Sequence, residues 1–457
     1  MEDEEHWAAE EFALVELGDK RRKKRLMELA EQRAGMPNGS IPNSCGGRAA
    51  TKAAYRLLDN EAVGAEEILA GHYASSIDRA QGAEIVLAVQ DTTELNYSHH
   101  PSTEGLGYLS ALSQQGMYVH STLLITPERV PLGLIDQYVW MRAAEDFRVN
   151  KEQHKTLPIP DKESWKWLVS LEATRRAKRQ LPQTRVINVG DAEADVFDVL
   201  LKAQQWQVEM IIRAAQNRVV AGPARYLWRL LEQQPLAGTL TVQVPRQKGK
   251  TARQAEVEVC FTELILPPPT KRQDEGLESV RLWAVLAKEP HPPAGEAGVE
   301  WLLLTTLRVT SFMEAQTVLH YYTCRWGVET YHKVLKSGCR VEERQFTTAD
   351  NLLRYLALDA VVAWRVLYLT MLSRALPDLP CTVFFAEEEW QALACFILKA
   401  KQAPASVPSL QQATRWVAQL GGFLGRKSDG HPGPMSIWRG LQRLTDITAT
   451  WLLFHDS

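Results

Sequence analysis

The order of apolar segments that begins at residue 84 places the strongest constraint on the fold. Strand-like and helix-like runs alternate there. Three strands are expected at 85–89, 117–126 and 132–142, then a helix at about 163–180, a strand at 185–189, a helix at about 194–204 and a strand at 208–215. This order predicts an α/β layer architecture, in which helices pack on a sheet.

Three strands, a helix, a strand, a helix and a strand are the elements of an RNase H-like core, so we predict that core. The alternation of strands and helices stops at residues 220–310, where strand-like runs are separated by polar or Pro-rich turns. This pattern indicates a β-rich insertion. A long helix is then expected at 312–337. Helical patterns precede and follow the core, so we predict three domains: a helical domain at 1–70, the core with its insertion at 71–350, and a second helical domain at 351–457.

Charge is unevenly distributed along the chain. The 457 residues carry a net charge of −3, which argues weakly against nucleic-acid binding. Residues 18–57, however, hold ten Lys or Arg and three Asp or Glu, a local net charge of +7 that could bind phosphates. No apolar run reaches the roughly 18 residues of a membrane helix, and the six scattered cysteines favour reduced thiols in a cytosolic protein.

Two carboxylates follow strands of the expected core. Asp91 and Asp191 each come directly after a buried apolar run. Ligand sites in open α/β sheets lie beyond the carboxyl ends of strands, so these side chains could share a divalent cation. Either aspartate could equally be a turn residue or a helix N-cap.

The expected helix at 312–337 places four functional side chains within roughly 60° of one face, at 100° per residue. They are Tyr322, Arg325, Glu329 and Lys336, and His332 and Lys333 flank them. Such a face suits phosphate and metal binding, although Arg325 and Glu329 could also be a solvated i,i+4 ion pair. Together Asp91, Asp191 and Glu329 are oxygen ligands of the type that Mg²⁺ or Mn²⁺ prefers, two ions per site.

The segment YTCRWGVETYHKVLK resembles the Tyr-Arg-Glu-Lys signature of bacterial insertion-sequence transposases, and QDTTELNYS and VGDAEADVF resemble their two aspartate motifs. The chain resembles the transposon-five type of the insertion-sequence-four family. One departure is Ala192, where the family has an arginine after the second aspartate.

The resemblance implies a role for each matching residue. Asp91, Asp191 and Glu329 would form the catalytic and metal-binding triad. Tyr322, Arg325 and Lys336, with Lys333 and His332, would hold DNA phosphate, and Trp301 would stack in place of a flipped base. The remaining expected DNA contacts are Arg213, Arg218, Arg48, Lys52, Tyr55 and Arg56.

The resemblance also implies the activity and partners. The chain would be a cut-and-paste DNA transposase that nicks the transferred strand, forms and resolves a hairpin, and joins the 3′-hydroxyl to target DNA. Its N-terminal domain would bind terminal inverted repeats and its C-terminal domain would dimerise in the synaptic complex. No organic cofactor or membrane is expected, and the location would be the bacterial cytoplasm, at the nucleoid. Two alternatives stay open: a structure-directed nuclease with an RNase H-like core, and a catalytically silent DNA-binding regulator.

Overall fold

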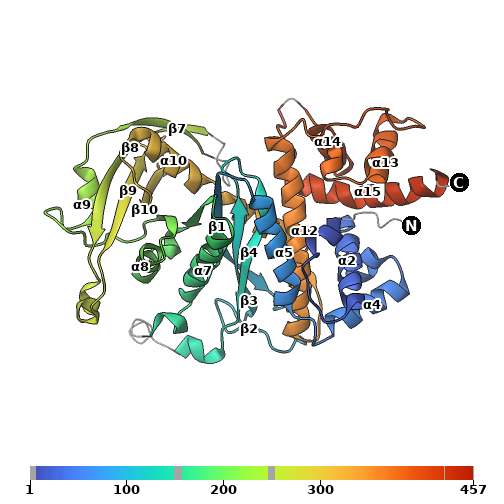
Figure 1. Ribbon diagram of the computed structural model, residues 1–457, viewed down its shortest axis with the longest axis horizontal. Helices are drawn as coiled ribbons and strands as arrows, with labels where there is room; N and C mark the ends of the chain where they lie inside the picture. The colour runs from blue at the N-terminus through green and yellow to red at the C-terminus, as the bar shows by residue number, and fades with distance from the viewer. Residues whose placement is uncertain (1–6, 149–156, 245–252, 427, 456–457) are drawn as a thin grey trace. The chain divides into compact units, whose positions relative to one another are not determined.

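The computed structural model describes residues 7–148, 157–244, 253–426 and 428–455 (Figure 1). Its internal contacts divide the chain into two compact units, which we describe separately. The sheet unit comprises Gly82–Asp91 and Asn150–Trp326. The terminal unit comprises Met1–Gln81, Thr92–Val149 and Gly327–Ser457.

The sheet unit contains most of the predicted α/β core and the whole insertion. Its elements are β1 (Ile85–Asn96, of which 85–91 belong here), α7 (Trp165–Gln180), β5 (Arg185–Gly190), α8 (Phe197–Gln205), β6 (Glu209–Arg213), α9 (Leu227–Glu232), β7 (Gly238–Val244), β8 (Arg253–Leu266), β9 (Val280–Lys288), β10 (Glu300–Thr305) and α10 (Phe312–Thr323).

The sheet of this unit is mixed. Strands β1, β5 and β6 pair in parallel, and β10, β9, β8 and β7 continue the order as antiparallel strands. The parallel strands are buried apolar runs because helices cover them, as a parallel sheet requires. Figure 1 shows α7 and α8 beside these strands, and Trp167, Phe197 and Met210 belong to the core they share. The antiparallel strands confirm the predicted β-rich insertion.

The terminal unit is mainly helical. Its helices are α1 (Trp7–Glu11), α2 (Lys20–Gly35), α3 (Ile41–Cys45), α4 (Arg48–Leu58), α5 (Ala65–Ala80), α11 (Trp326–Lys333, from residue 327), α12 (Ala349–Ala375), α13 (Glu387–Leu398), α14 (Leu410–Leu420) and α15 (Pro434–His455). Its strands are β2 (Gly107–Tyr108), β3 (Gln115–Ile125) and β4 (Pro131–Trp140). The order β1, β3, β4, α7, β5, α8, β6 is the one predicted for an RNase H-like core.

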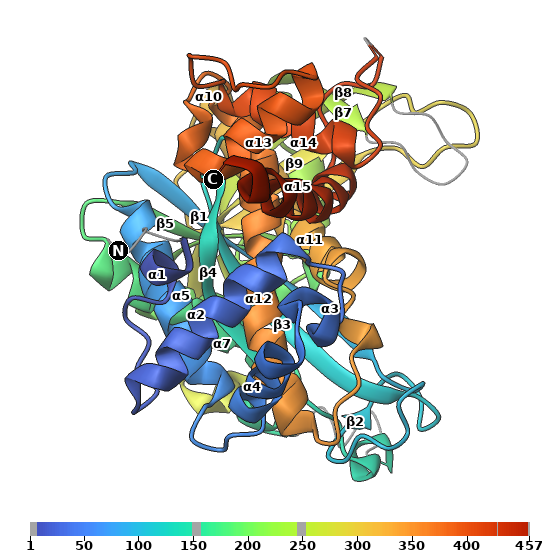
Figure 2. The same cartoon turned by 90° about the vertical axis from the view of Figure 1, so that its right-hand side faces the viewer.

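Helix α12 is the core of the terminal unit. It packs against α2, α4 and α5, as Figure 2 shows, and also against α14 and α15. By length and composition α12 could cross a membrane, but 83% of its most apolar stretch is buried inside the protein. Its burial identifies α12 as a core helix of this unit.

The expectation of one continuous helix at 312–337 is wrong. Helix α10 ends at Thr323, α11 begins at Trp326, and a π-helical turn follows at Val334–Gly338. The backbone N–H groups of Cys324 and Arg325 bond to carbonyls three residues earlier, which tightens the chain and breaks the α-helical ladder. The angles computed for an unbroken helix therefore do not hold across residues 324 and 325.

Candidate active site

Strand register brings the two predicted aspartates of the sheet unit to the same edge. Val89 of β1 pairs with Val189 of the parallel strand β5, so Asp91 and Asp191 each lie two residues further toward the carboxyl end. Gly190 of β5 pairs with Ile212 of β6, so Arg213 follows at the same edge. The edge at which the parallel pairing of β1, β5 and β6 ends thus carries two carboxylates and a guanidinium.

A buried polar chain fixes the strands beneath this edge. The Gln90 side-chain amide donates to Oδ1 of Asn188 at 2.6 Å, and the Asn188 amide donates to Thr174 Oγ1 on α7 at 2.8 Å. These three side chains are buried, so their polar groups need hydrogen-bond partners within the protein. Residues directly before Asp91 and near Asp191 are therefore held in one arrangement.

Asp191 is a half-buried carboxylate at this edge. Its Oδ1 accepts the backbone N–H of Glu193 at 2.8 Å, so it caps the short 3₁₀ turn Ala192–Ala194. Burial raises the pKa of Asp191, and the opposing effects of Arg325 and Lys166 do not cancel that rise. A cation near Asp191 would offset the energetic cost of burying its ionised carboxylate.

Arg325 links Asp91 to two aromatic rings. Its Nη1 lies 3.5 Å from Oδ2 of Asp91, and its guanidinium carbon lies 6.0 Å from the centre of the Tyr322 ring. Trp301 on β10 meets Tyr322 edge-on, with ring centres 6.4 Å apart. Burial raises the pKa of Tyr322, so its hydroxyl stays protonated. The sheet unit thus groups three predicted DNA-binding residues around a fourth, Tyr322: Arg325, Trp301 and Arg213, whose charge acts on Tyr322.

Arg218, a predicted DNA contact, has an internal partner. Its Nε donates to Oδ1 of Asp195 at 2.6 Å, and Asp195 is buried. Oδ2 of Asp195 also accepts the backbone N–H groups of Ala215 and Gln216. Arg218 therefore fastens the loop after β6 to the segment that follows Asp191, whereas Arg213 is exposed and donates to the Glu300 carbonyl.

The other residues of the predicted Tyr-Arg-Glu-Lys face lie in the terminal unit. Glu329 is half-buried in the first turn of α11, and Lys333 is exposed at its end. Lys336 donates to the Glu94 carbonyl at 2.8 Å and lies 3.5 Å from Glu342.

His332 does not suit the predicted phosphate contact. It is buried with Nε2 3.2 Å from Ser121 Oγ. Burial, aided by the charge of Lys336, lowers its pKa to about 3, so it is neutral near pH 7 and offers no positive charge.

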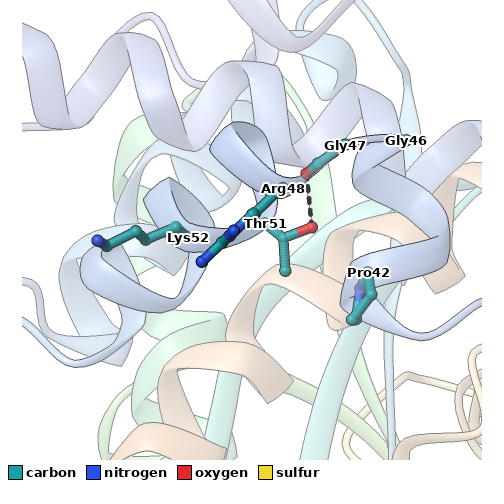
Figure 3. Close-up of a pocket in the computed structure, with 6 residues that line it drawn as sticks. All are labelled: Pro42, Gly46, Gly47, Arg48, Thr51 and Lys52. Atoms are coloured by element: carbon teal, nitrogen blue, oxygen red, sulfur yellow. Dashed lines mark hydrogen bonds between the residues drawn. The ribbon is translucent and has the colours of Figure 1, made fainter.

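The predicted end-binding residues share the exposed side of α4. Arg48, Lys52 and Arg56 are exposed, and Tyr55 is half-buried beside them. A hollow of about 740 Å³ opens at the start of this helix (Figure 3), lined by Pro42, Gly46, Gly47, Arg48, Thr51 and Lys52. Gly46 has φ of 63°, which favours glycine, and the Thr51 hydroxyl donates to the Gly47 carbonyl at 2.8 Å.

The donor set fits a divalent cation that is shared with a substrate. Among the described residues, no three His, Cys, Asp or Glu side chains form a closed ligand cluster. Mg²⁺ is usually held by one or two carboxylates, waters and substrate phosphates, so a site that is open on the protein side matches its chemistry. Asp91 and Asp191 supply hard oxygen ligands for such an ion.

One charged residue near the site was missed in the sequence. Lys166 on α7 is largely buried, and its Nζ lies 2.9 Å from Glu193, two residues after Asp191. A lysine among the apolar residues of an amphipathic helix, in KESWKW, was the available signal.

Three family models match the chain. A transposase DNA-binding model matches residues 4–63, a transposase DDE domain model matches residues 159–364, and a model of the Tn5 transposase dimerisation domain matches residues 361–450. The basic helix α4 lies in the first range and Asp191 in the second.

Proposed function

Because the chain belongs to the Tn5-type DDE transposases, we propose that it moves a DNA element by cut-and-paste transposition. In this proposal the protein binds terminal inverted repeats and nicks the transferred strand at each end. The freed 3′-hydroxyl attacks the opposite strand and closes a hairpin. A water opens the hairpin, and the same 3′-hydroxyl then joins target DNA.

The observation that carries the proposal is the matched register of Asp91 and Asp191 on adjacent parallel strands. Two carboxylates at one sheet edge can hold the ions that phosphoryl transfer needs, with Glu329 assigned as the third ligand on its sequence motif. Two divalent cations, Mg²⁺ or Mn²⁺, would activate the attacking oxygen and stabilise the leaving oxygen. The raised pKa of Asp191 supports a cation there, because burial, together with the charge of Glu193, disfavours the ionised carboxylate.

The surrounding side chains orient the DNA end. Arg325 offers a planar fork to a phosphate, and the protonated Tyr322 hydroxyl can donate to the same group. Trp301 beside Tyr322 provides a stacking surface for a base flipped out of the strained terminus. Lys333, Lys336 and Arg213 add positive charge along the strand in this proposal.

The domain roles follow the same reasoning. We assign end recognition to residues 1–70, through Arg48, Lys52, Tyr55 and Arg56, catalysis to 71–350 and dimerisation to 351–457. Each of two subunits would cut an end bound mainly by its partner. The proposed location is the bacterial cytoplasm, at the nucleoid, where the DNA substrates lie.

An excision assay tests this function. The purified protein is incubated with Mg²⁺ and a plasmid that carries the flanking ends of its own gene. We expect an excised fragment from the wild type and none from Asp191→Asn, while Asp274→Asn, an exposed aspartate of the same unit, behaves as wild type. Nicking without end specificity would instead favour the nuclease, and specific binding without cleavage the silent regulator.

A further inference from the structure

An exposed aromatic and basic surface follows β6 in the sheet unit. We call it the 219–229 patch, and its members are Val219, Arg225, Tyr226, Trp228 and Arg229. Trp228 is 51% exposed, and Tyr226 and Val219 are 39% and 44% exposed. Large apolar side chains that gather on a surface usually mark an interaction site, whereas single ones do not.

The backbone under the patch is well fixed. Val219 and Tyr226 form an antiparallel bridge, and the Val220 N–H donates to the Arg225 carbonyl at 3.0 Å. Leu227 and Leu231, on the other side of α9, are buried in the core of the unit. The exposed rings therefore stand on an ordered hairpin and a short, anchored helix.

Arg225, directly after the turn of this hairpin, holds an energetically unfavourable backbone conformation. Its φ is 65°, in the left-handed region that an arginine rarely adopts. Its guanidinium carbon lies 5.5 Å from the centre of the Tyr226 ring, so a positive charge and an aromatic ring are presented together. Such outliers persist where the surrounding structure enforces them, and they gather at functional sites.

The patch carries two arginines and no acidic residue, in a chain that is acidic as a whole. Residues 213–229 contain four arginines and no aspartate, glutamate or lysine, although the chain as a whole has a net charge of −3. Asp195 neutralises Arg218, which leaves the charges of Arg225 and Arg229 on the exposed surface. These two exposed positive charges favour a polyanion as the partner over a protein surface that is neutral or only weakly acidic.

Strand order places Arg213, six residues before this segment, at the edge that carries Asp191. The 219–229 segment continues from Arg213 at the carboxyl end of β6, next to the end of β5 that carries Asp191. Asp195, four residues after Asp191, accepts hydrogen bonds from Ala215, Gln216 and Arg218. DNA bound on the patch would therefore lie on the same unit as Asp91 and Asp191.

We propose that the 219–229 patch binds target DNA for the joining step, an inference that rests on the function proposed above. Arg225 and Arg229 contact phosphates, and Trp228 with Tyr226 inserts as an apolar wedge that unstacks a base step and bends the duplex. Arginine–phosphate contacts and stacking tolerate any sequence, which suits a target that varies from one insertion to the next.

The test separates joining from excision. Precut transposon ends with free 3′-hydroxyls are supplied with a target plasmid, and the same proteins are assayed for excision. We expect Trp228→Ala, and the pair Arg225→Asn with Arg229→Ala, to reduce joining about tenfold, or about 1.4 kcal/mol. Excision by these variants should stay at the wild-type level. Met313→Ala and Arg281→Ala, exposed residues elsewhere in the sheet unit, are the matched controls.

A distorted target DNA shows whether Trp228→Ala loses joining because the wedge is missing or because the variant is misfolded. For Trp228→Ala, a target with a mismatch that already unstacks a base step should recover most of the joining lost on intact duplex. Unchanged joining in the patch variants would overturn the proposal. So would a smaller assembly in size-exclusion chromatography, which would identify the patch as a protein interface. If the wild type itself neither excises nor joins, the proposed function fails rather than the patch.

Discussion

His72 is fully buried in the terminal unit, and its two ring nitrogens have different partners. Nδ1 lies 2.5 Å from Oε1 of Glu11, and Nε2 accepts the backbone N–H of Leu134 at 3.0 Å. A ring that donates from Nδ1 and accepts at Nε2 is neutral. Burial lowers the pKa of His72 despite the nearby Glu11, which agrees with this assignment.

This histidine makes the stability of the terminal unit sensitive to acid. The unfolded chain takes up a proton near pH 6.5, whereas folded His72 resists it, so the free energy of unfolding falls as the pH drops below that value. Urea denaturation from about pH 7.5 to about pH 5.5 measures this fall. In His72→Gln the amide oxygen can still accept from Leu134 but does not titrate, so the fall should be smaller. Equal slopes in the two proteins would contradict the account.

At the scale of elements, one buried ion pair joins α2 to α12. Nε and Nη2 of Arg33 lie 3.0 Å and 3.1 Å from the two carboxylate oxygens of Asp359, and both side chains are fully buried. Nη1 of Arg33 also donates to the Ser44 hydroxyl at 2.8 Å. The pair therefore fixes the loop between α2 and α4, which leads to the basic residues of α4.

Removing one member of this ion pair should lower the stability of the folded protein strongly. Arg33→Met leaves Asp359 as an uncompensated buried charge, so we expect a loss of about 3–5 kcal/mol in the free energy of unfolding. The double variant Arg33→Met with Asp359→Leu should regain part of that loss, because no buried charge remains. Urea titrations of the three proteins measure both effects. A double variant less stable than Arg33→Met would refute this interpretation.

Most elements of the sheet unit could be predicted from the sequence because local patterns determine them. Buried parallel strands are short apolar runs, and the period of 3.6 residues indicates α7 in this unit, as it does α15 in the terminal unit. The break at Cys324 and Arg325 could not be predicted, since apolar residues continue on both sides of it. Only the change to hydrogen bonds that span three residues reveals it.

The candidate site likewise contains residues that could be predicted from the sequence and residues that could not. Asp91 and Asp191 could be found because each follows a buried apolar run, and such runs lead toward the sheet edge where ligands bind, although β1 itself continues past Asp91 to Asn96. The pair Asp195–Arg218 and the contact of Lys166 with Glu193 could not, because they depend on tertiary approach between separate elements. Burial of His332 likewise depends on β3, through Ser121.

At the scale of the whole molecule, the proposed dimer predicts which subunit binds and which subunit cuts each DNA end. Asp191→Asn keeps end binding but cannot cut, and a variant with Arg48, Lys52 and Arg56 changed to alanine keeps the aspartates but binds ends poorly. If each subunit cuts the end bound by its partner, mixing the two should restore cleavage at a single end. End-labelled DNA measures this cleavage, and neither protein alone should show it. No cleavage in the mixture would indicate that each subunit cuts its own end.

The structure of the excised ends tests the central claim most directly. The account holds that a 3′-hydroxyl freed at the Asp91–Asp191 edge attacks the opposite strand. Excised DNA sampled early in a Mg²⁺ reaction is separated under denaturing conditions. We predict that its two strands stay covalently joined through the hairpins and migrate as one molecule, and that this species is absent with Asp191→Asn. Separate strands at every time point, or nicks scattered along the plasmid, would contradict the account.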